Sequence, residues 1–234
     1  MKLSLLRRTV AEFIGTLFLL AAVVGSGIMG ERLAAGNIAL ALLANTIATG
    51  AALIAIILAF GPISGAHLNP AVTLADAWTG GIPWRETPVY IAAQLAGAFA
   101  GVTLAHLMFG LSVVSASTHP RNGLAQLLSE FIATFGLLAV IWGCARSHRP
   151  SAVPFAVGAY ITAAYWFTAS TSFANPAVTI ARSMTNTFAG IRSSDVAGFV
   201  AAQLAGAFAA TLLFQWLLPP LKRERTSNPL THPV

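Results

Sequence analysis

The chain of 234 residues is 56% hydrophobic and only 9% charged. So few charged residues cannot cover the surface of a water-soluble globule, and the composition therefore excludes an ordinary soluble domain. The net charge of +6 comes from basic residues scattered over short loops and both termini, with no basic patch interleaved with aromatic residues. We therefore expect no nucleic-acid partner and predict a protein embedded in a lipid bilayer.

Six apolar runs have about the length of a bilayer-spanning helix, on the order of 20 residues. They cover residues 10–30, 38–60, 87–109, 125–144, 153–170 and 196–218. The first run contains Glu12 and lacks a small-residue cleavage site, so we expect a retained helix and not a signal peptide. The sequence predicts an all-α membrane protein with six transmembrane helices.

Basic residues predict the orientation of these helices. If both termini are cytoplasmic, that side holds nine basic residues: Lys2, Arg7, Arg8, Arg85, Arg146, Arg149, Lys222, Arg223 and Arg225. The other side holds four: Arg32, Arg121, Arg182 and Arg192. The positive-inside rule favours this orientation, with both termini in the cytoplasm. We expect the protein to lie in the inner (plasma) membrane of the cell. The polar, proline-broken segment 219–234 is predicted to be a disordered cytoplasmic tail.

Three segments occur twice, in the same order, in the two halves of the chain. They are AEFIGTLFLL (11–20) with SEFIATFGLL (129–138), HLNPAVTLAD (67–76) with FANPAVTIAR (173–182), and AAQLAGAFA, identical at 92–100 and 201–209. Because each half contains three spans, an odd number, the second half must lie inverted in the membrane. We therefore predict a first repeat at 1–109, a connecting loop at 110–124 and a second repeat at 125–218.

Small residues in the third repeated segment predict close helix packing. Gly97 and Gly101 are four residues apart, as are Gly206 and Ala210. This spacing places them on one face of each helix, where neighbouring backbones can approach closely. The pattern supports a compact bundle and does not by itself indicate transport.

The two Asn-Pro-Ala segments are too short to span a bilayer. Residues 69–78 and 175–184 would each form about 15 Å of helix, roughly half the hydrocarbon thickness. Asparagine is a favoured N-cap and proline suits the first helical turn, so Asn-Pro predicts a helix start in both copies. The irregular stretches GPISGAHL and ASTSFA before them must be buried in protein or line a cavity. We expect two re-entrant half-helices in an inverted three-plus-three repeat, meeting at the midplane.

Two facing helix starts give this midplane point a defined chemistry. The helix N-termini supply partial positive charge, and Asn69 and Asn175 supply carboxamide donors. A small uncharged molecule with a lone pair is favoured there, whereas cations and protons are disfavoured. A single Asn-Pro could serve only as a structural cap, but two copies in symmetric positions favour a pore-lining role.

The paired boxes, the AEFIGT start, SGAHLNPAVT and the AAQLAGA span resemble the aquaporin (major intrinsic protein) family from about residue 8 to 218. The resemblance implies a homotetramer in which each six-helix subunit has its own pore for water or small neutral solutes. It assigns the central constriction to Asn69, Pro70, Ala71, Asn175, Pro176 and Ala177. It also implies that Glu12 and Glu130 hold the re-entrant loops through backbone amides and that His67 braces the first half-helix. Proton-coupling carboxylates are the alternative for the two glutamates.

The chain departs from the common family pattern after the second box, where Val178 takes the place of an arginine that lines the outer, narrowest ring. Arg182 lies one helical turn further on the same face, where it either edges the vestibule or packs into the loop. By the family's offsets, Thr49 and Ser172 also belong to this selectivity ring. The fourth position is Tyr165 if the loop is two residues shorter than usual and Ala163 if it is not.

A ring without a fixed cation or a histidine predicts an opening wider and less polar than that of a strict water channel. We expect a passive channel for water, glycerol, urea, ammonia or neutral metalloid hydroxides such as arsenous acid (arsenite), as in arginine-lacking bacterial members. A strict water channel, a proton-coupled secondary transporter and a purely structural, junction-forming member are the alternatives. An enzyme is not expected, because no His, Cys and carboxylate cluster has metal-ligand or triad spacing, and no cofactor is predicted.

Overall fold

The computed structural model describes residues 3–218, and the predicted tail 219–234 lies outside them. The long helices are α1 (Leu5–Leu33), α2 (Ile38–Ser64), α4 (Thr87–Met108), α5 (Leu124–Arg146), α6 (Val153–Phe167) and α8 (Ser193–Leu217). The short ones are α3 (Pro70–Trp78) and α7 (Pro176–Ala181), with 3₁₀ turns η1 (Pro150–Ala152) and η2 (Arg182–Met184). Within residues 3–218 there is no strand, so the all-α prediction is confirmed.

Five of these helices, α1, α2, α4, α5 and α8, are long and apolar enough to cross a membrane. The sixth predicted span is shorter than expected, because α6 has only 15 residues and ends at Phe167 rather than at residue 170. Its length is about 22 Å. The helix ends where Thr168 adopts an extended conformation and the chain turns inward toward the second Asn-Pro-Ala box. The early end of α6 therefore frees residues for the second re-entrant loop.

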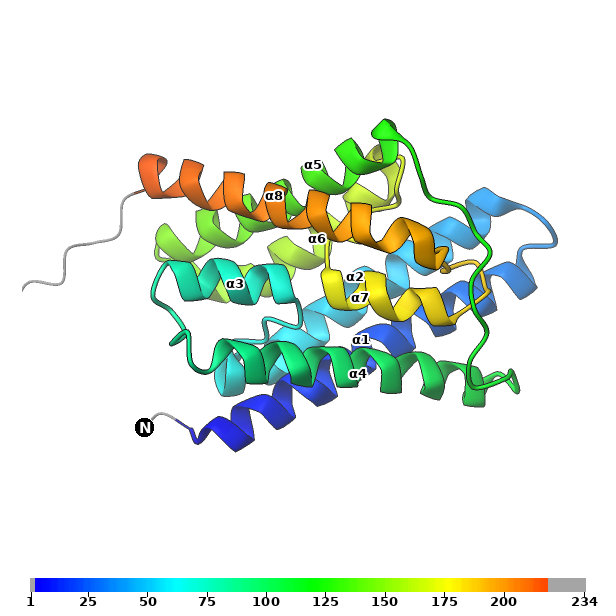
Figure 1. Cartoon of the computed structure of the whole chain (residues 1–234), viewed down its shortest axis with the longest axis horizontal. Coiled ribbons are helices and arrows are strands. Elements are labelled where there is room, and N and C mark those ends of the chain that lie inside the picture. Colours follow the sequence, from blue (N-terminus) through cyan, green and yellow to red (C-terminus); the bar gives the residue numbers. More distant parts are fainter. Residues whose placement is uncertain (1–2, 219–234) are drawn as a thin grey trace, which may run out of the picture.

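The two halves repeat one arrangement in opposite directions. Each half consists of two long helices, a short helix and a third long helix, in the order predicted from the repeated segments. In Figure 1, α1 runs from left to right and α5 runs from right to left, as an inverted repeat requires. The start of α1 and the end of α8 consequently lie at the same end of the bundle (Figure 1). We call this the terminal end.

Small residues hold the outer helices of each half together. A Cβ atom at Gly97 would overlap the carbonyl oxygen of Phe13, and one at Gly206 would overlap the carbonyl oxygen of Phe131. The α4 and α8 backbones therefore lie directly against the α1 and α5 backbones, as the glycine spacing predicted. The same device joins the halves, because Gly50 of α2 lies against Gly158 of α6.

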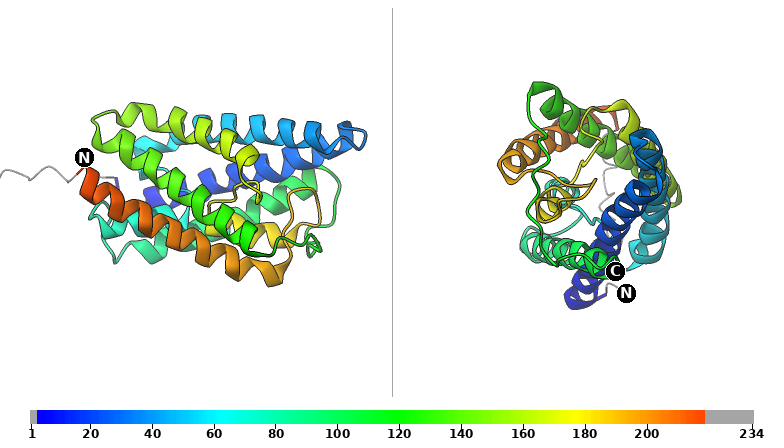
Figure 2. Two further views of the ribbon diagram at one scale, coloured as in Figure 1. Left: turned by 90° about the horizontal axis from the view of Figure 1, so that it is seen from above. Right: turned by 90° about the vertical axis from the view of Figure 1, so that its right-hand side faces the viewer.

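The short helices lie inside the bundle, and both α3 and α7 pack between α4 and α8. The end-on view of Figure 2 shows the long helices around them. In Figure 1, α3 runs from the centre toward the terminal end and α7 runs from the centre toward the opposite end. The GPIS part of the stretch expected to be irregular is instead the last turn of α2, which contains Pro62, so only residues 65–68 precede the first box without helical structure.

We predict that Gly206→Ala destabilises the protein by about 1–3 kcal/mol, because the added methyl group would force α5 and α8 apart. Thermal unfolding of the detergent-solubilised protein measures this effect. Gly61→Ala is the matched control, since nothing lies within 4 Å of a Cβ built at this helical glycine. Equal unfolding temperatures for the two variants would contradict the close backbone contact.

Candidate functional site

Each Asn-Pro-Ala box begins its half-helix as the sequence predicts. The side-chain oxygen of Asn69 accepts a hydrogen bond from the backbone N–H of Ala71 at 2.9 Å. The side-chain oxygen of Asn175 accepts from the N–H groups of Ala177 at 3.0 Å and Val178 at 3.3 Å. Both asparagines have extended backbone dihedrals, and proline occupies the first turn of each helix. The oxygens are therefore committed to capping.

The side-chain nitrogens of the same two asparagines cross between the halves. Asn69 donates to the carbonyl oxygen of Ala174 at 2.8 Å, and Asn175 donates to the carbonyl oxygen of Leu68 at 2.7 Å. Each acceptor is the residue immediately before the other asparagine. Because a carboxamide nitrogen carries two N–H groups, each asparagine retains a second donor beyond the crossed bond.

The loops before the boxes have an unusual backbone that makes this crossing possible. Ala66 and Leu68 have φ values of 46° and 52°, and the equivalent Ser172 and Ala174 have 49° and 48°. These left-handed conformations are rare in residues other than glycine and persist only where neighbouring groups enforce them.

Buried glutamates hold the two loops in this conformation. The carboxylate of Glu12 accepts the backbone N–H groups of His67 at 2.9 Å and Leu68 at 2.7 Å. In the second half, Glu130 accepts the N–H groups of Phe173 and Ala174, both at 2.9 Å. Both glutamates are 0% exposed. These are the contacts that the family resemblance implies.

Two glutamines, which sequence analysis missed, link each glutamate to its half-helix. Gln94 donates to Glu12 at 2.8 Å and to the Thr73 hydroxyl at 2.9 Å. Gln203 donates to Glu130 and Thr179 in the same way, at 2.6 and 2.8 Å. A polar residue inside an identical apolar span of both halves was the available signal, because AAQLAGAFA was interpreted only as a packing motif.

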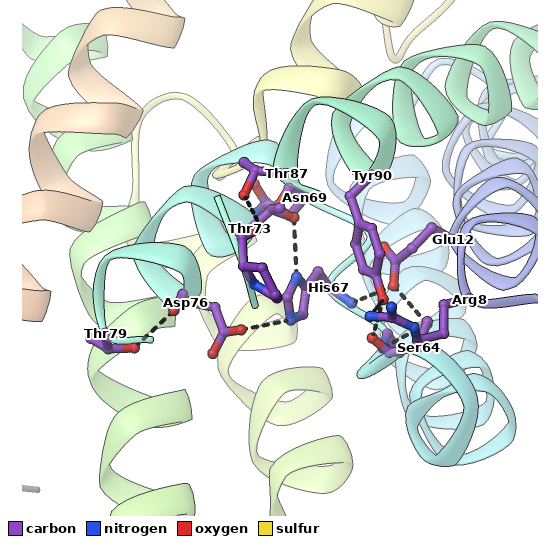
Figure 3. A network of polar contacts seen from close by, with 12 residues as sticks. Arg8, Glu12, Ser64, His67, Asn69, Thr73, Asp76, Thr79, Thr87 and Tyr90 are labelled. Carbon is purple, nitrogen blue, oxygen red and sulfur yellow. Dashed lines mark hydrogen bonds and ion pairs between the residues drawn. The ribbon is translucent and has the colours of Figure 1, made fainter. Parts of the chain in front are cut away.

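His67 belongs to the hydrogen-bond network of the first half-helix. Its Nδ1 is 3.1 Å from the Thr73 hydroxyl, and its Nε2 is 3.6 Å from the Asp76 carboxylate. Figure 3 shows the ring between these two side chains of the first half-helix, with Glu12 and Arg8 nearby. His67 therefore contacts two side chains of α3 that lie about one turn apart, in the middle and in the last turn of the helix. The role of Asp76 beside it was not predicted.

A cavity of about 760 Å³ runs past both boxes. Among the predicted site residues it is lined by Thr49, His67, Asn69, Tyr165, Ser172, Asn175, Val178 and Arg182. The other predicted residues, Glu12, Pro70, Ala71, Glu130, Pro176 and Ala177, are buried and do not line it. The structure thus brings the asparagines and the ring residues to one cavity, while the remaining residues of the boxes form the support behind it.

The four predicted ring residues lie on this cavity. Tyr165 of α6 donates from its hydroxyl to the Thr49 hydroxyl of α2 at 3.4 Å, within hydrogen-bond distance at its long limit. Ser172 and Val178 come from the second re-entrant loop and the first turn of α7. Ala163 is exposed on the outside of α6 and does not line the cavity. Of the two alternatives for the fourth position, the geometry favours Tyr165.

The Arg182 side chain was expected either to edge the vestibule or to pack into the loop, and the structure combines the two. Its guanidinium stacks on the ring of Phe173 at 3.4 Å from the ring centroid, and its Nε donates to the carbonyl oxygen of Ala189. The residue is only 2% exposed, yet it lines the cavity beside Val178. A guanidinium therefore lies on the cavity wall, although none directly follows the second box.

The connecting loop supports this region. Arg121 lies over the same Phe173 ring at 4.9 Å and donates to the carbonyl oxygens of Gly190 and Ser170. Burial lowers the pKa of Arg121, an effect opposed by the charge of Glu130. The loop backbone also hydrogen-bonds to η2 at Ser183 and Met184. The loop thus fixes the turn that carries Arg182.

Comparison with known proteins accords with this geometry. The family model described as "Major intrinsic protein" matches residues 1–172 and 147–233. The chain belongs to the major intrinsic protein family. Major intrinsic proteins similar to it include "Aquaglyceroporin AqpS" of Rhizobium meliloti (strain 1021), which is 57% identical over 231 residues and 98% of each chain.

Two further proteins show how far the similarity extends. "Aquaporin NIP1-4" of Oryza sativa subsp. japonica is 39% identical over 151 residues, which are 64% of this chain and 54% of that protein. The X-ray structure of the aquaglyceroporin from Plasmodium falciparum superposes with a TM-score of 0.74 at 22% identity, over 93% of this chain and 98% of that one. The structural match shows a shared fold.

We predict that Glu130→Gln lowers stability by about 1–3 kcal/mol, because an amide group would turn a donor toward groups that now donate to the carboxylate. Thermal unfolding in detergent measures the change. Glu31→Gln is the control, since Glu31 is exposed and makes one long hydrogen bond of 3.3 Å. A folded Glu130→Gln protein of unchanged stability that no longer conducts solute would overturn the supporting role.

Proposed function

We propose that the chain is a passive channel that conducts water and small uncharged solutes such as glycerol. One observation carries the proposal: the crossed asparagines Asn69 and Asn175 line one cavity from opposite halves of the chain. Each offers a carboxamide N–H to a molecule with a lone pair, and the apolar side chains around them offer few competing partners. The similarity to "Aquaglyceroporin AqpS" supports glycerol as a solute.

Ions and protons are excluded by the same arrangement. The half-helices α3 and α7 direct their positive ends toward the centre, and a cation that leaves water there finds donors in place of acceptors. The carboxylates of Glu12 and Glu130 are fully buried and occupied by donors, so they offer no site for coupled transport. A proton-coupled transporter would have to rely on Asp76, which lines the cavity, whereas the two glutamates do not.

The selectivity ring lacks an arginine, which widens the range of solutes that can pass. The ring consists of Thr49, Tyr165, Ser172 and Val178. Valine in place of the family arginine leaves an apolar, compact side chain at this position. We infer that urea, ammonia and neutral metalloid hydroxides such as arsenous acid also pass. A strict water channel is the second candidate, and it is favoured by the hydroxyl contact between Tyr165 and Thr49, which narrows the opening.

The setting of the channel follows from sequence and fold together. We place it in the plasma membrane with both termini cytoplasmic, which accords with the positive-inside count and with the shared terminal end of α1 and α8. The repeats 1–109 and 125–218, joined by 110–124, act as one functional unit. A homotetramer is proposed on the family resemblance alone.

We predict that Val178→Arg lowers glycerol and urea flux far more than water flux, because a guanidinium narrows the ring and holds ordered water. Stopped-flow light scattering of proteoliposomes with matched protein content measures all three. Val178→Leu, which adds bulk without charge, separates the effect of size from that of charge. A wild-type protein that passes water alone would identify a strict water channel, and equal losses of water and glycerol would refute the assignment of Val178 to the ring.

A further inference from the structure

The two half-helices end in opposite charges at equivalent positions. Asp76 is the seventh residue after Asn69, and Arg182 is the seventh residue after Asn175. Each faces the aromatic ring two residues before its asparagine, since Asp76 lies beside His67 and Arg182 stacks on Phe173. Both charged residues line the cavity, so the symmetric scaffold carries a carboxylate toward the terminal end and a guanidinium toward the ring.

The Arg182 side chain is fixed. Phe173, on which it stacks, is itself held edge-on by Phe199 at 5.3 Å and covered by Arg121. The Nε hydrogen bond to Ala189 sets the direction of the guanidinium plane. A long side chain so constrained has already lost its rotamer freedom, which makes it suitable for positioning a charge at a defined point.

Two polar groups at this point have no partner. Among residues 3–218, neither Nη1 of Arg182 nor the hydroxyl of Ser172 has a hydrogen-bond partner, although both atoms are buried. Arg182 and Ser172 are 2% and 3% exposed, and both line the cavity. Buried polar atoms are usually paired, and a guanidinium donor without a protein acceptor points to an acceptor brought by water or solute.

We propose that Arg182 is a specificity-determining cation beside the ring, supplied from one helical turn beyond Val178, and that its unpaired guanidinium donor binds an oxygen atom of the passing solute. The inference rests on the proposed channel function and deepens it. Val178 of α7 and Arg182, the first residue of η2, both line the cavity, and the compact valine side chain leaves the guanidinium access to it. The guanidinium therefore stands one helical turn back from Val178, and the opening at Val178 itself stays apolar, as the proposed function requires.

Removing this charge tests the proposal. We expect Arg182→Gln to raise the ratio of glycerol to water permeability by about threefold or more, because the cavity wall beside the ring loses bulk and a fixed charge. Proton leak, followed with a pH-sensitive dye inside the same proteoliposomes, should rise about tenfold. Wild-type flux is measured first, so that a protein conducting neither water nor glycerol disproves the proposed function and not this inference.

The matched control is Arg121→Gln. Arg121 contacts the same Phe173 ring and the same loop but does not line the cavity, so its loss should lower stability and change the permeability ratio much less than Arg182→Gln does. If both variants change the ratio equally, Arg182 acts only by bracing the loop and the proposal is overturned. An unchanged ratio in folded Arg182→Gln overturns it as well.

A second substitution covers the case in which Arg182→Gln does not fold. Arg182→Lys keeps the charge but loses the planar stack and the forked donors. We expect this variant to retain proton exclusion while its glycerol-to-water ratio rises. Wild-type values for both quantities in Arg182→Lys would show that the guanidinium is not required at the ring.

Discussion

Two crossed hydrogen bonds determine the rest of this structure. Asn69 and Asn175 each donate to the carbonyl group that precedes the other, over separations of 105 and 107 residues in the chain. A single buried hydrogen bond contributes only about 1 kcal/mol, but leaving its groups unpaired costs about 1–3 kcal/mol. The halves must therefore meet in this one register, because any shift would leave four buried polar groups without partners.

The crossing imposes demands on the surrounding chain. A carbonyl group can face the opposite half only if its loop adopts left-handed conformations at Leu68 and Ala174, and such a backbone needs external support. That support comes from Glu12 and Glu130, whose carboxylates in turn accept hydrogen bonds from four backbone N–H groups and two glutamines. Ionisable groups inside two apolar spans are thus explained by the backbone that they stabilise.

The residues that support the re-entrant loops are the same in both halves, whereas some residues on the cavity wall differ. Asparagine, proline, threonine, glutamine and glutamate occur at equivalent places in both halves because both loops require the same geometry. Two of the positions that face the cavity differ: His67 and Asp76 in one half correspond to Phe173 and Arg182 in the other. These residues can differ between the halves because the crossed asparagines and the buried glutamates hold both loops without them.

Much of this fold could be predicted from the sequence, because the repeated segments reveal inverted halves and Asn-Pro reveals helix starts. Local patterns could not show that α6 ends at Phe167, since its end depends on the path of the loop beneath it. They also could not show where Arg182 points. That direction depends on Ala189 and on the ring of Phe173, which tertiary packing alone brings together. The glutamines could have been noticed as polar residues repeated in two apolar spans, but their partners come from other helices and could not be predicted.

Passive conduction of neutral molecules without protons is the central claim, and it can be tested in a single preparation. Wild-type protein in proteoliposomes with a pH-sensitive dye inside is mixed with a glycerol gradient, and vesicle volume and internal pH are recorded together, with and without a protonophore. We predict rapid water and glycerol movement, unchanged internal pH and no effect of the protonophore. Glycerol flux that requires a proton gradient, or that carries protons with it, would contradict the account.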